Sequence, residues 1–383
     1  MSSPTPVSFG VTSRVSVGGL LDRVSGVVRK TPTLIIELAA VERAYRSFVA
    51  SFPHSAIFYA LKANPDPIVA GRLADMGSGF EIASSAELEM LRELKVDASR
   101  IISSNTIKKA GFVVEAYEYG IRHFGFDSMA ELQKLRRYAP GSYVSARLAV
   151  PNEGSDWPLD KKFGASPQEV VDLMTSAASY GLEPTGITFH VGSQCRDPQS
   201  WAVALDIVSD VLKALAKQGI PLRIINIGGG MPIAYANDEV PRADVVAAAV
   251  HERTSEFADG VEVWLEPGRA FVGEAGTLVS EVIGLAEREG RRWVYLDVGI
   301  FHGLAEAIGG ISYTFEAGPG ELKPCVIAGP SCDSFDVITK DGLLPELEVG
   351  DLVAVRAAGA YSTVYASTFN GFPLPETIVV ETL

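Results

Sequence analysis

Short apolar runs alternate with longer amphipathic segments between residues 56 and 266. The runs have the length and composition of buried strands, whereas the segments carry apolar residues at the spacing of one helix face. Trp201, Leu205 and Val208 show this spacing in the predicted helix 199–218, and further helices are predicted at 128–138 and 167–180. The predicted strands are 56–61, 79–83, 100–104, 121–126, 143–149, 185–190, 223–227 and 261–265.

Eight strands that alternate with helices indicate an α/β fold. An open, doubly wound sheet is one arrangement of such a pattern, but the count of eight favours a closed (β/α)8 TIM-like barrel. We therefore predict a barrel domain over 35–268.

The pattern changes after residue 270, where long helical segments give way to short β-rich pieces separated by Gly and Pro. This texture predicts a C-terminal all-β domain over 269–383, completed by residues 1–34. Its predicted strands are 277–283, 292–297, 324–328, 351–357 and 377–382.

Composition narrows the class of protein. The 383 residues carry a formal charge of −14 without a basic cluster, which argues against nucleic acid or an anionic membrane as partner. No apolar stretch is long enough to span a bilayer, and the N-terminus lacks the pattern of a secretory signal. Cys195, Cys325 and Cys332 are too few and too irregularly spaced for a disulfide framework or a zinc site. A cytoplasmic enzyme without a metal is the expectation.

Four groups of reactive or glycine residues follow predicted strands. Lys62 follows the first strand, His190 ends the sixth, Gly228-Gly229-Gly230 follows the seventh, and Glu266-Pro267-Gly268-Arg269 follows the eighth. The carboxyl ends of barrel strands share one rim, which is where barrel enzymes place their reactive residues. The four groups are therefore predicted to converge.

Each group has an ordinary explanation when it is taken alone. Lys62 could be a strand-end lysine reaching solvent, His190 a core histidine, the glycines a tight turn, and Arg269 part of a surface ion pair. The glycines are not a dinucleotide fingerprint, because Met231-Pro232-Ile233 follows them.

Together the groups fit one ligand. A lysine ending an apolar run is predicted to have a depressed pKa and to act as a nucleophile toward an aldehyde. Bare glycine N–H groups and Arg269 suit a phosphate, Glu266 a protonated ring nitrogen, and a flat His190 ring a stacked heteroaromatic. An aldehyde, a pyridinium nitrogen and a phosphate are the handles of pyridoxal 5′-phosphate.

At this point the chain resembles a known family, the fold type III (alanine-racemase-fold) pyridoxal-phosphate decarboxylases of ornithine, lysine and diaminopimelate, and most closely the bacterial ornithine/lysine enzymes. The resemblance covers nearly the whole chain. The motifs that carry it are Phe58-Tyr59-Ala60-Leu61-Lys62-Ala63-Asn64, Gly79-Phe80-Glu81-Ile82-Ala83-Ser84, Phe189-His190-Val191-Gly192-Ser193, Gly228-Gly229-Gly230, Glu266-Pro267-Gly268-Arg269, Gly329-Pro330-Ser331-Cys332-Asp333 and Gly359-Ala360-Tyr361.

The resemblance implies a PLP-dependent carboxy-lyase in which Lys62 forms a Schiff base with the cofactor and His190 stacks on its ring. It also implies a homodimer with shared active sites, in which Cys332 protonates Cα and Asp333 faces the distal end of the substrate, both from the second subunit. A role in polyamine biosynthesis is typical of such enzymes. The cofactor contacts implied by the resemblance are Lys62, Glu81, Arg147, His190, Ser193, Gly228, Gly229, Gly230, Glu266, Gly268, Arg269 and Tyr361.

One segment departs from the family pattern. Ornithine and lysine decarboxylases usually bring a second carboxylate to the distal ammonium, but Gly309 and Gly310 stand where it is expected. Glu306 could substitute, being about one helical turn earlier. The alternative is a decarboxylase of the same family that acts on a bulkier or less basic amino acid in secondary metabolism. An amino-acid racemase and an inactive regulatory homologue are the remaining alternatives, and the Gly-Pro-Ser-Cys-Asp element, Lys62 and the intact glycine loop argue against them.

Overall fold

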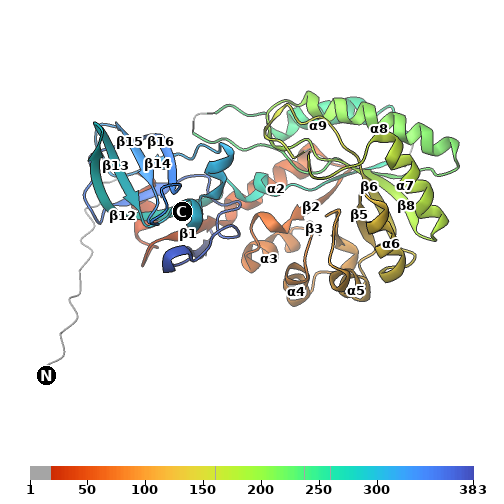
Figure 1. Ribbon diagram of the computed structural model, residues 1–383, viewed down its shortest axis with the longest axis horizontal. Coiled ribbons are helices and arrows are strands. Elements are labelled where there is room, and N and C mark those ends of the chain that lie inside the picture. The colour runs from red at the N-terminus through yellow and green to blue at the C-terminus, as the bar shows by residue number, and fades with distance from the viewer. Residues whose placement is uncertain (1–18, 160, 237, 259) are drawn as a thin grey trace, which may run out of the picture.

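A computed structural model describes residues 19–159, 161–236, 238–258 and 260–383. The chain forms two parts that lie end to end, a barrel and a β domain (Figure 1). Residues 1–18 of the predicted β domain lie outside the described residues.

The first part is the predicted parallel barrel. Its strands are hydrogen-bonded in the order β4-β3-β2-β11-β10-β8-β6-β5. A parallel bridge between Ser103 and Phe124 joins the two ends of this order and brings β4 against β5. The strands are β2 Ala56–Ala60, β3 Gly79–Glu81, β4 Ile101–Ile102, β5 His123–Phe126, β6 Tyr143–Arg147, β8 Glu183–Thr188, β10 Ile224–Asn226 and β11 Glu262–Leu265. All eight predicted strands are confirmed.

Amphipathic helices surround the barrel and bury one face on it. In α8, Trp201, Val208 and Leu215 are fully buried, as their spacing predicts. Helix α7 begins at a capping box in which Ser166 and Glu169 satisfy each other's backbone N–H groups. The helices are α2 Leu38–Ser51, α3 Pro67–Asp75, α4 Ser85–Glu93, α5 Ala110–Tyr119, α6 Met129–Tyr138, α7 Pro167–Ser179, α8 Gln199–Lys217, α9 Ala243–Thr254 and α10 Arg269–Val272. Among the described residues, no helix combines the length and apolarity needed to cross a membrane.

The second part is a β domain whose strands come from both ends of the chain. The order β14-β17-β12-β13-β15-β16 forms its path, and β1 pairs with β12 and β18. Helix α1 (Leu20–Ser25) contributes Val24 to a small core with Ile35, Val279 and Ala354. The strands are β1 Thr33–Glu37, β12 Gly276–Arg288, β13 Arg291–Leu296, β14 Phe315–Glu316, β15 Lys323–Ala328, β16 Val337–Leu344, β17 Leu352–Val355 and β18 Glu376–Val380.

The remaining elements are one two-stranded ribbon and several short 3₁₀ turns. A two-stranded ribbon, β7 (Ser155–Trp157) with β9 (Ser193–Cys195), lies beside the barrel. The 3₁₀ turns are η1 Leu61–Ala63, η2 Ala98–Arg100, η3 Ile300–His302, η4 Ala305–Gly309 and η5 Phe369–Gly371.

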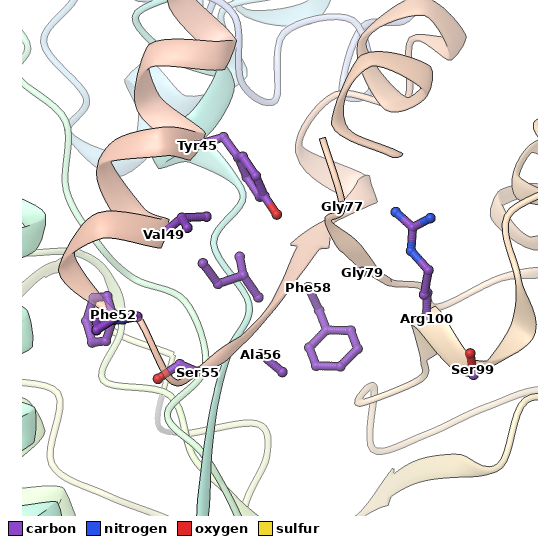
Figure 2. Close-up of a pocket in the computed structure, with 12 residues that line it drawn as sticks. Tyr45, Val49, Phe52, Ser55, Ala56, Phe58, Gly77, Gly79, Ser99 and Arg100 are labelled. Atoms are coloured by element: carbon purple, nitrogen blue, oxygen red, sulfur yellow. The ribbon is translucent and has the colours of Figure 1, made fainter. Parts of the chain in front are cut away.

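A pocket of about 370 Å³ opens at the other end of the barrel. Tyr45 of α2 lines it together with Phe52, which follows that helix, Ala56 at the amino end of β2, Phe58 and Arg100 (Figure 2). The Arg100 guanidinium is already bound to the carbonyl oxygens of Ala74 and Ser78. This pocket therefore lies at the opposite end of β2 from Lys62 and contains none of the predicted site residues.

Candidate active site

Lys62 lies in η1, immediately after β2, and its amine contacts the neighbouring strand. Ala60 and Glu81 are register partners of β2 and β3, so Glu81 ends its strand beside the start of η1. The Lys62 Nζ lies 2.5 Å from Glu81 Oε2, and Glu81 is buried. Gly268 allows this turn to pack closely, because a Cβ there would lie 2.9 Å from the Cβ of Ala63.

The surroundings of Lys62 differ from the apolar ones predicted from the sequence. Burial acts to lower the Lys62 pKa, but the charges of Glu81, Tyr361 and Glu266 raise it above its ordinary value. The prediction of a depressed pKa was therefore wrong, because the apolar run does not show what the adjacent strand brings. Half of the Lys62 side-chain surface remains accessible, so the amine can meet a ligand.

His190 lies two residues beyond β8 as a neutral imidazole. Its Nδ1 accepts a hydrogen bond from the Gly192 N–H at 3.0 Å. Burial, and then the positive charges of Arg147 and Lys62, lower its pKa to about 3. Asn152 donates a hydrogen bond to the His190 carbonyl oxygen and holds the backbone in place. The ring is therefore fixed and uncharged near neutral pH, as a stacking partner should be.

The loop Gly228–Gly230 follows β10 and packs against this ring. A Cβ atom on any of the three glycines would lie 2.3–2.6 Å from a carbonyl oxygen and 3.4–3.6 Å from a His190 ring atom. Gly228 and Gly230 also have positive φ, which other residues adopt only with strain. The structure thus requires glycine at this loop, whose Gly228 N–H donates to Asn226 Oδ1 at 2.9 Å.

Glu266 follows β11 and is held by a residue that was not predicted. The amide of Asn226, at the end of β10, donates to Glu266 Oε1 at 2.5 Å. Burial, and then the neighbouring charge of Glu81, raise the pKa of Glu266. A buried carboxyl of this kind is suited to a cationic N–H partner. Asn226 could have been found as a polar residue in an otherwise apolar strand, two positions before the glycine loop.

Arg269 begins α10 and is buried in a dense network. Its Nη1 and Nη2 donate to Glu306 Oε2 and Oε1 at 2.6 and 2.5 Å. Nη1 also donates to the Tyr235 hydroxyl at 2.7 Å, and Nη2 to Ser193 Oγ at 3.3 Å. Burial alone would lower the Arg269 pKa, but Glu306 raises it above the ordinary value.

Tyr361 brings the β domain against this rim. It adopts a positive φ of 58°, and its backbone N–H donates to the Ala63 carbonyl oxygen at 2.8 Å. Its ring centroid lies 5.0 Å from the Arg269 guanidinium carbon. Asn64 donates to the Gly359 carbonyl oxygen in the same contact. Tyr361 therefore lies between the lysine and the arginine, where the resemblance implies a phosphate contact.

Arg147 ends β6 at the same rim of the barrel. Burial lowers its pKa, and its positive charge is one of those that lower the His190 pKa. Cys332 and Asp333 are exposed on the β domain, where the Cys332 N–H donates to Asn370 and Asp333 accepts from the Phe335 N–H. The sequence allowed Glu306 to face the distal end of a substrate. In the structure its carboxylate is instead paired with Arg269.

The Trp157 ring packs against Gly309, the first of the two glycines that stand where the family's second carboxylate is expected. A Cβ on Gly309 would lie 2.2 Å from the Trp157 ring, whereas one on Gly310 would meet nothing within 4 Å. Gly309 is therefore required by its aromatic neighbour, whose ring occupies the space that a side chain at position 309 would need. Trp157 is also the register partner of Ser193, so the ring lies close to the Arg269 network.

These residues fit pyridoxal phosphate. The glycine loop admits no side chain, because a Cβ there would collide with a neighbouring carbonyl oxygen, and the Arg269 Nε is buried without a hydrogen-bond partner. A reachable amine, a buried carboxyl and a fixed imidazole border the same rim. The set therefore supplies groups for an aldehyde, a ring nitrogen, a ring face and a phosphate.

Comparison with known proteins agrees with this chemistry. A family model described as the pyridoxal binding domain of pyridoxal-dependent decarboxylases matches residues 38–273. Lysine/ornithine decarboxylase of Selenomonas ruminantium is 38% identical over 354 residues, which cover 92% of this chain and 90% of that protein.

Two solved structures are similar over almost the whole chain. The structure of SrLDC in complex with PLP and cadaverine has a TM-score of 0.88 and 36% identity, and the match covers 94% of this chain and 93% of that one. Lysine/ornithine decarboxylase of Vibrio vulnificus, complexed with putrescine, has a TM-score of 0.87 and 33% identity, with 95% and 98% covered.

Proposed function

The chain belongs to the pyridoxal-dependent decarboxylases and is a PLP-dependent amino-acid decarboxylase; on this premise we propose the roles of its residues and the class of its substrate. The proposed substrate is an ornithine- or lysine-like amino acid, which is converted to its amine and CO₂. The observation that carries the roles is the convergence of Lys62, His190, the glycine loop and Glu266 on one rim of the barrel.

When bound, pyridoxal phosphate supplies a ring that withdraws the electrons left at Cα as CO₂ departs. Lys62 would bind its aldehyde, and Glu81 holds the amine in place from 2.5 Å away. Glu266, oriented by Asn226, would accept the ring N–H, and the neutral His190 would cover one ring face. The glycine loop and Ser193 would donate hydrogen bonds to the phosphate. Tyr361 and Gly268 close the site around Lys62.

Cys332 is proposed to deliver the proton to Cα from a second copy of the chain, in a homodimer with shared sites. Its exposure on the β domain, together with Asp333, supports this role. Co-expression of Lys62→Ala with Cys332→Ala tests it, because only a mixed dimer then assembles one intact site. Each variant alone should be nearly inactive, and the mixture should recover about a quarter of wild-type turnover. A mixture no more active than its components would reject the shared site.

The distal end of the substrate distinguishes the proposed substrate from a second candidate. Asp333 suits a terminal ammonium, but Glu306 is consumed by Arg269, so a less basic or bulkier amino acid is the second candidate. The test measures kcat/KM on L-ornithine, L-lysine and a panel of neutral and bulky amino acids, with amines identified by mass spectrometry. Preference for ornithine or lysine supports the first candidate, and preference for a neutral amino acid supports the second.

We further propose that the enzyme works in the cytoplasm, in polyamine or secondary metabolism according to its substrate. Three cysteines that are all free support a reducing compartment. Localisation of the tagged full chain by cell fractionation is the corresponding measurement.

A further inference from the structure

The Arg269 guanidinium has all four of its terminal N–H groups engaged by protein. Glu306 takes one from each Nη atom, and Tyr235 and Ser193 take the other two. A guanidinium has only five donors, and the fifth, on Nε, is buried without a partner. The predicted phosphate clamp is therefore already bound to a carboxylate.

This pair is tightly held. Arg269 and Glu306 are each 5% exposed at the side chain, and they meet through two short hydrogen bonds. Separating a buried ion pair leaves an uncompensated charge, which is strongly unfavourable. We infer that Glu306 stays on Arg269 when the cofactor binds. A phosphate dianion is attracted to a free arginine and repelled by a carboxylate. Because the two charges of the pair nearly cancel, the pair attracts the phosphate much less than Arg269 alone would.

We propose that Glu306 is a positioning residue for the cofactor's phosphate, which fixes Arg269 in place and weakens phosphate binding by neutralising it. Arg269 then acts through Ser193. The Ser193 hydroxyl accepts the Arg269 Nη2 hydrogen bond and keeps its own proton to donate to a phosphate oxygen. The backbone N–H groups of Gly229 and Gly230 supply the remaining donors, whereas the Gly228 N–H already donates to Asn226 Oδ1.

The position of Glu306 connects this effect to the β domain. Glu306 lies in η4, whereas Arg269 begins α10 at the barrel rim. Gly309, at the end of the same turn, packs on Trp157 of the ribbon that carries Ser193. The docking of η4 on the barrel therefore sets both the place of Arg269 and its charge balance.

Charge-removing variants test the proposal through binding of the apoenzyme to pyridoxal phosphate, inorganic phosphate and pyridoxal. Glu306→Gln keeps the shape and one acceptor, so it should tighten binding of both phosphate-bearing ligands by about tenfold and leave pyridoxal unchanged. Arg269→Gln leaves Glu306 as an unpaired charge and should weaken phosphate binding by about a hundredfold. Glu316→Gln, from the Arg356 pair in the β domain, is the matched control and should change nothing.

The double variant Arg269→Gln/Glu306→Gln removes both charges and should bind inorganic phosphate within about threefold of the wild type. This variant decides the question if Glu306→Gln fails to fold, because it leaves no unpaired buried charge. A double variant as weak as Arg269→Gln would overturn the proposal. Weakening of phosphate and pyridoxal alike by Glu306→Gln would also overturn it, since a purely structural role predicts that result.

Discussion

The candidate site has two halves that the fold builds differently. The barrel half, with Lys62, Glu81, His190 and Glu266, lies at the rim of the barrel, and each of these side chains is held by a hydrogen bond within one chain, to Glu81, Lys62, Gly192 and Asn226 respectively. The β-domain half, which carries Cys332 with Asp333, is exposed and held in its own domain by Asn370. The first half suits a cofactor that is the same throughout a family, and the second suits a substrate that varies.

The difference has a physical origin in the backbone. Parallel strands share a register, so Ala60 and Glu81 bring their neighbours to the rim in a fixed relation. The Cys332 loop depends on a few polar contacts, among them the buried Asp336, which accepts from the Ile300 and Ser331 N–H groups. Substitutions in the barrel half should therefore reduce cofactor binding and activity. Substitutions in the β-domain half should alter substrate preference before they reduce activity.

The largest effect is expected at Lys62. Lys62→Ala removes the amine placed against Glu81, so the visible absorbance of bound pyridoxal phosphate should disappear and kcat should fall by at least about 10⁴-fold. Absorbance spectra and steady-state rates measure the two effects. A purified variant that keeps both its colour and its turnover would remove Lys62 from the chemistry.

A matched glycine pair compares the two halves directly. Gly230 and Gly310 have nearly the same φ, 90° and 94°, but a Cβ meets a carbonyl oxygen at 2.3 Å on Gly230 and nothing within 4 Å on Gly310. Gly230→Ala should weaken cofactor binding by about a hundredfold or more through this clash, whereas Gly310→Ala should cost only about 1 kcal/mol of stability through backbone strain. Cofactor titration and thermal unfolding measure these effects. Equal losses of cofactor affinity in the two variants would mean that the close contact of Gly230 with the Gly192 carbonyl oxygen does not determine cofactor binding.

Asp333 should have a smaller and more selective effect. Asp333→Asn removes a charge from an exposed loop, so kcat/KM for lysine or ornithine should fall about 10- to 100-fold while cofactor absorbance stays unchanged. Asp341→Asn, an exposed carboxylate elsewhere in the β domain, is the control. An equal loss on a neutral amino acid would show that Asp333 does not contact the distal end of the substrate.

The same division explains what could be predicted from the sequence. Barrel strands follow from apolar runs, and the residues after them follow from the rule that parallel strands share a rim. The alternation fails in β16, where Asp341 and Gly342 look like a turn and the register with β15 is irregular, so this strand was missed. Local patterning therefore predicted the barrel better than the β domain.

Contacts between separate elements could not be predicted in the same way. The pairing of Arg269 with Glu306 depends on how η4 docks on the barrel, and neither residue carries a local signal of the other. The raised pKa of Lys62 depends on Glu81 from the adjacent strand. Charge balance inside a site is thus set by tertiary neighbours, which the spacing of residues along one strand does not reveal.

The smallest effect is expected from the ionisation of His190. Its pKa in the folded chain is about 3, below the value of about 6.5 for a free histidine, so the unfolded state binds more protons between these values. Stability should consequently decrease as pH falls from about 6.5 toward 3. His190→Phe keeps a flat ring for stacking and removes this contribution. The Tm of the holoenzyme should then fall less between pH 7 and pH 5 than in the wild type.

His54→Gln, at an exposed histidine, is the control for this measurement and should leave the pH dependence of the wild type unchanged. His123, whose pKa burial lowers to about 4, remains in both proteins and should preserve part of the slope. If the His190→Phe profile matches the wild type, His190 is not held neutral by its surroundings. The fixed, uncharged ring would then no longer distinguish the barrel half from the exposed half, because His190 would ionise as freely as a surface histidine.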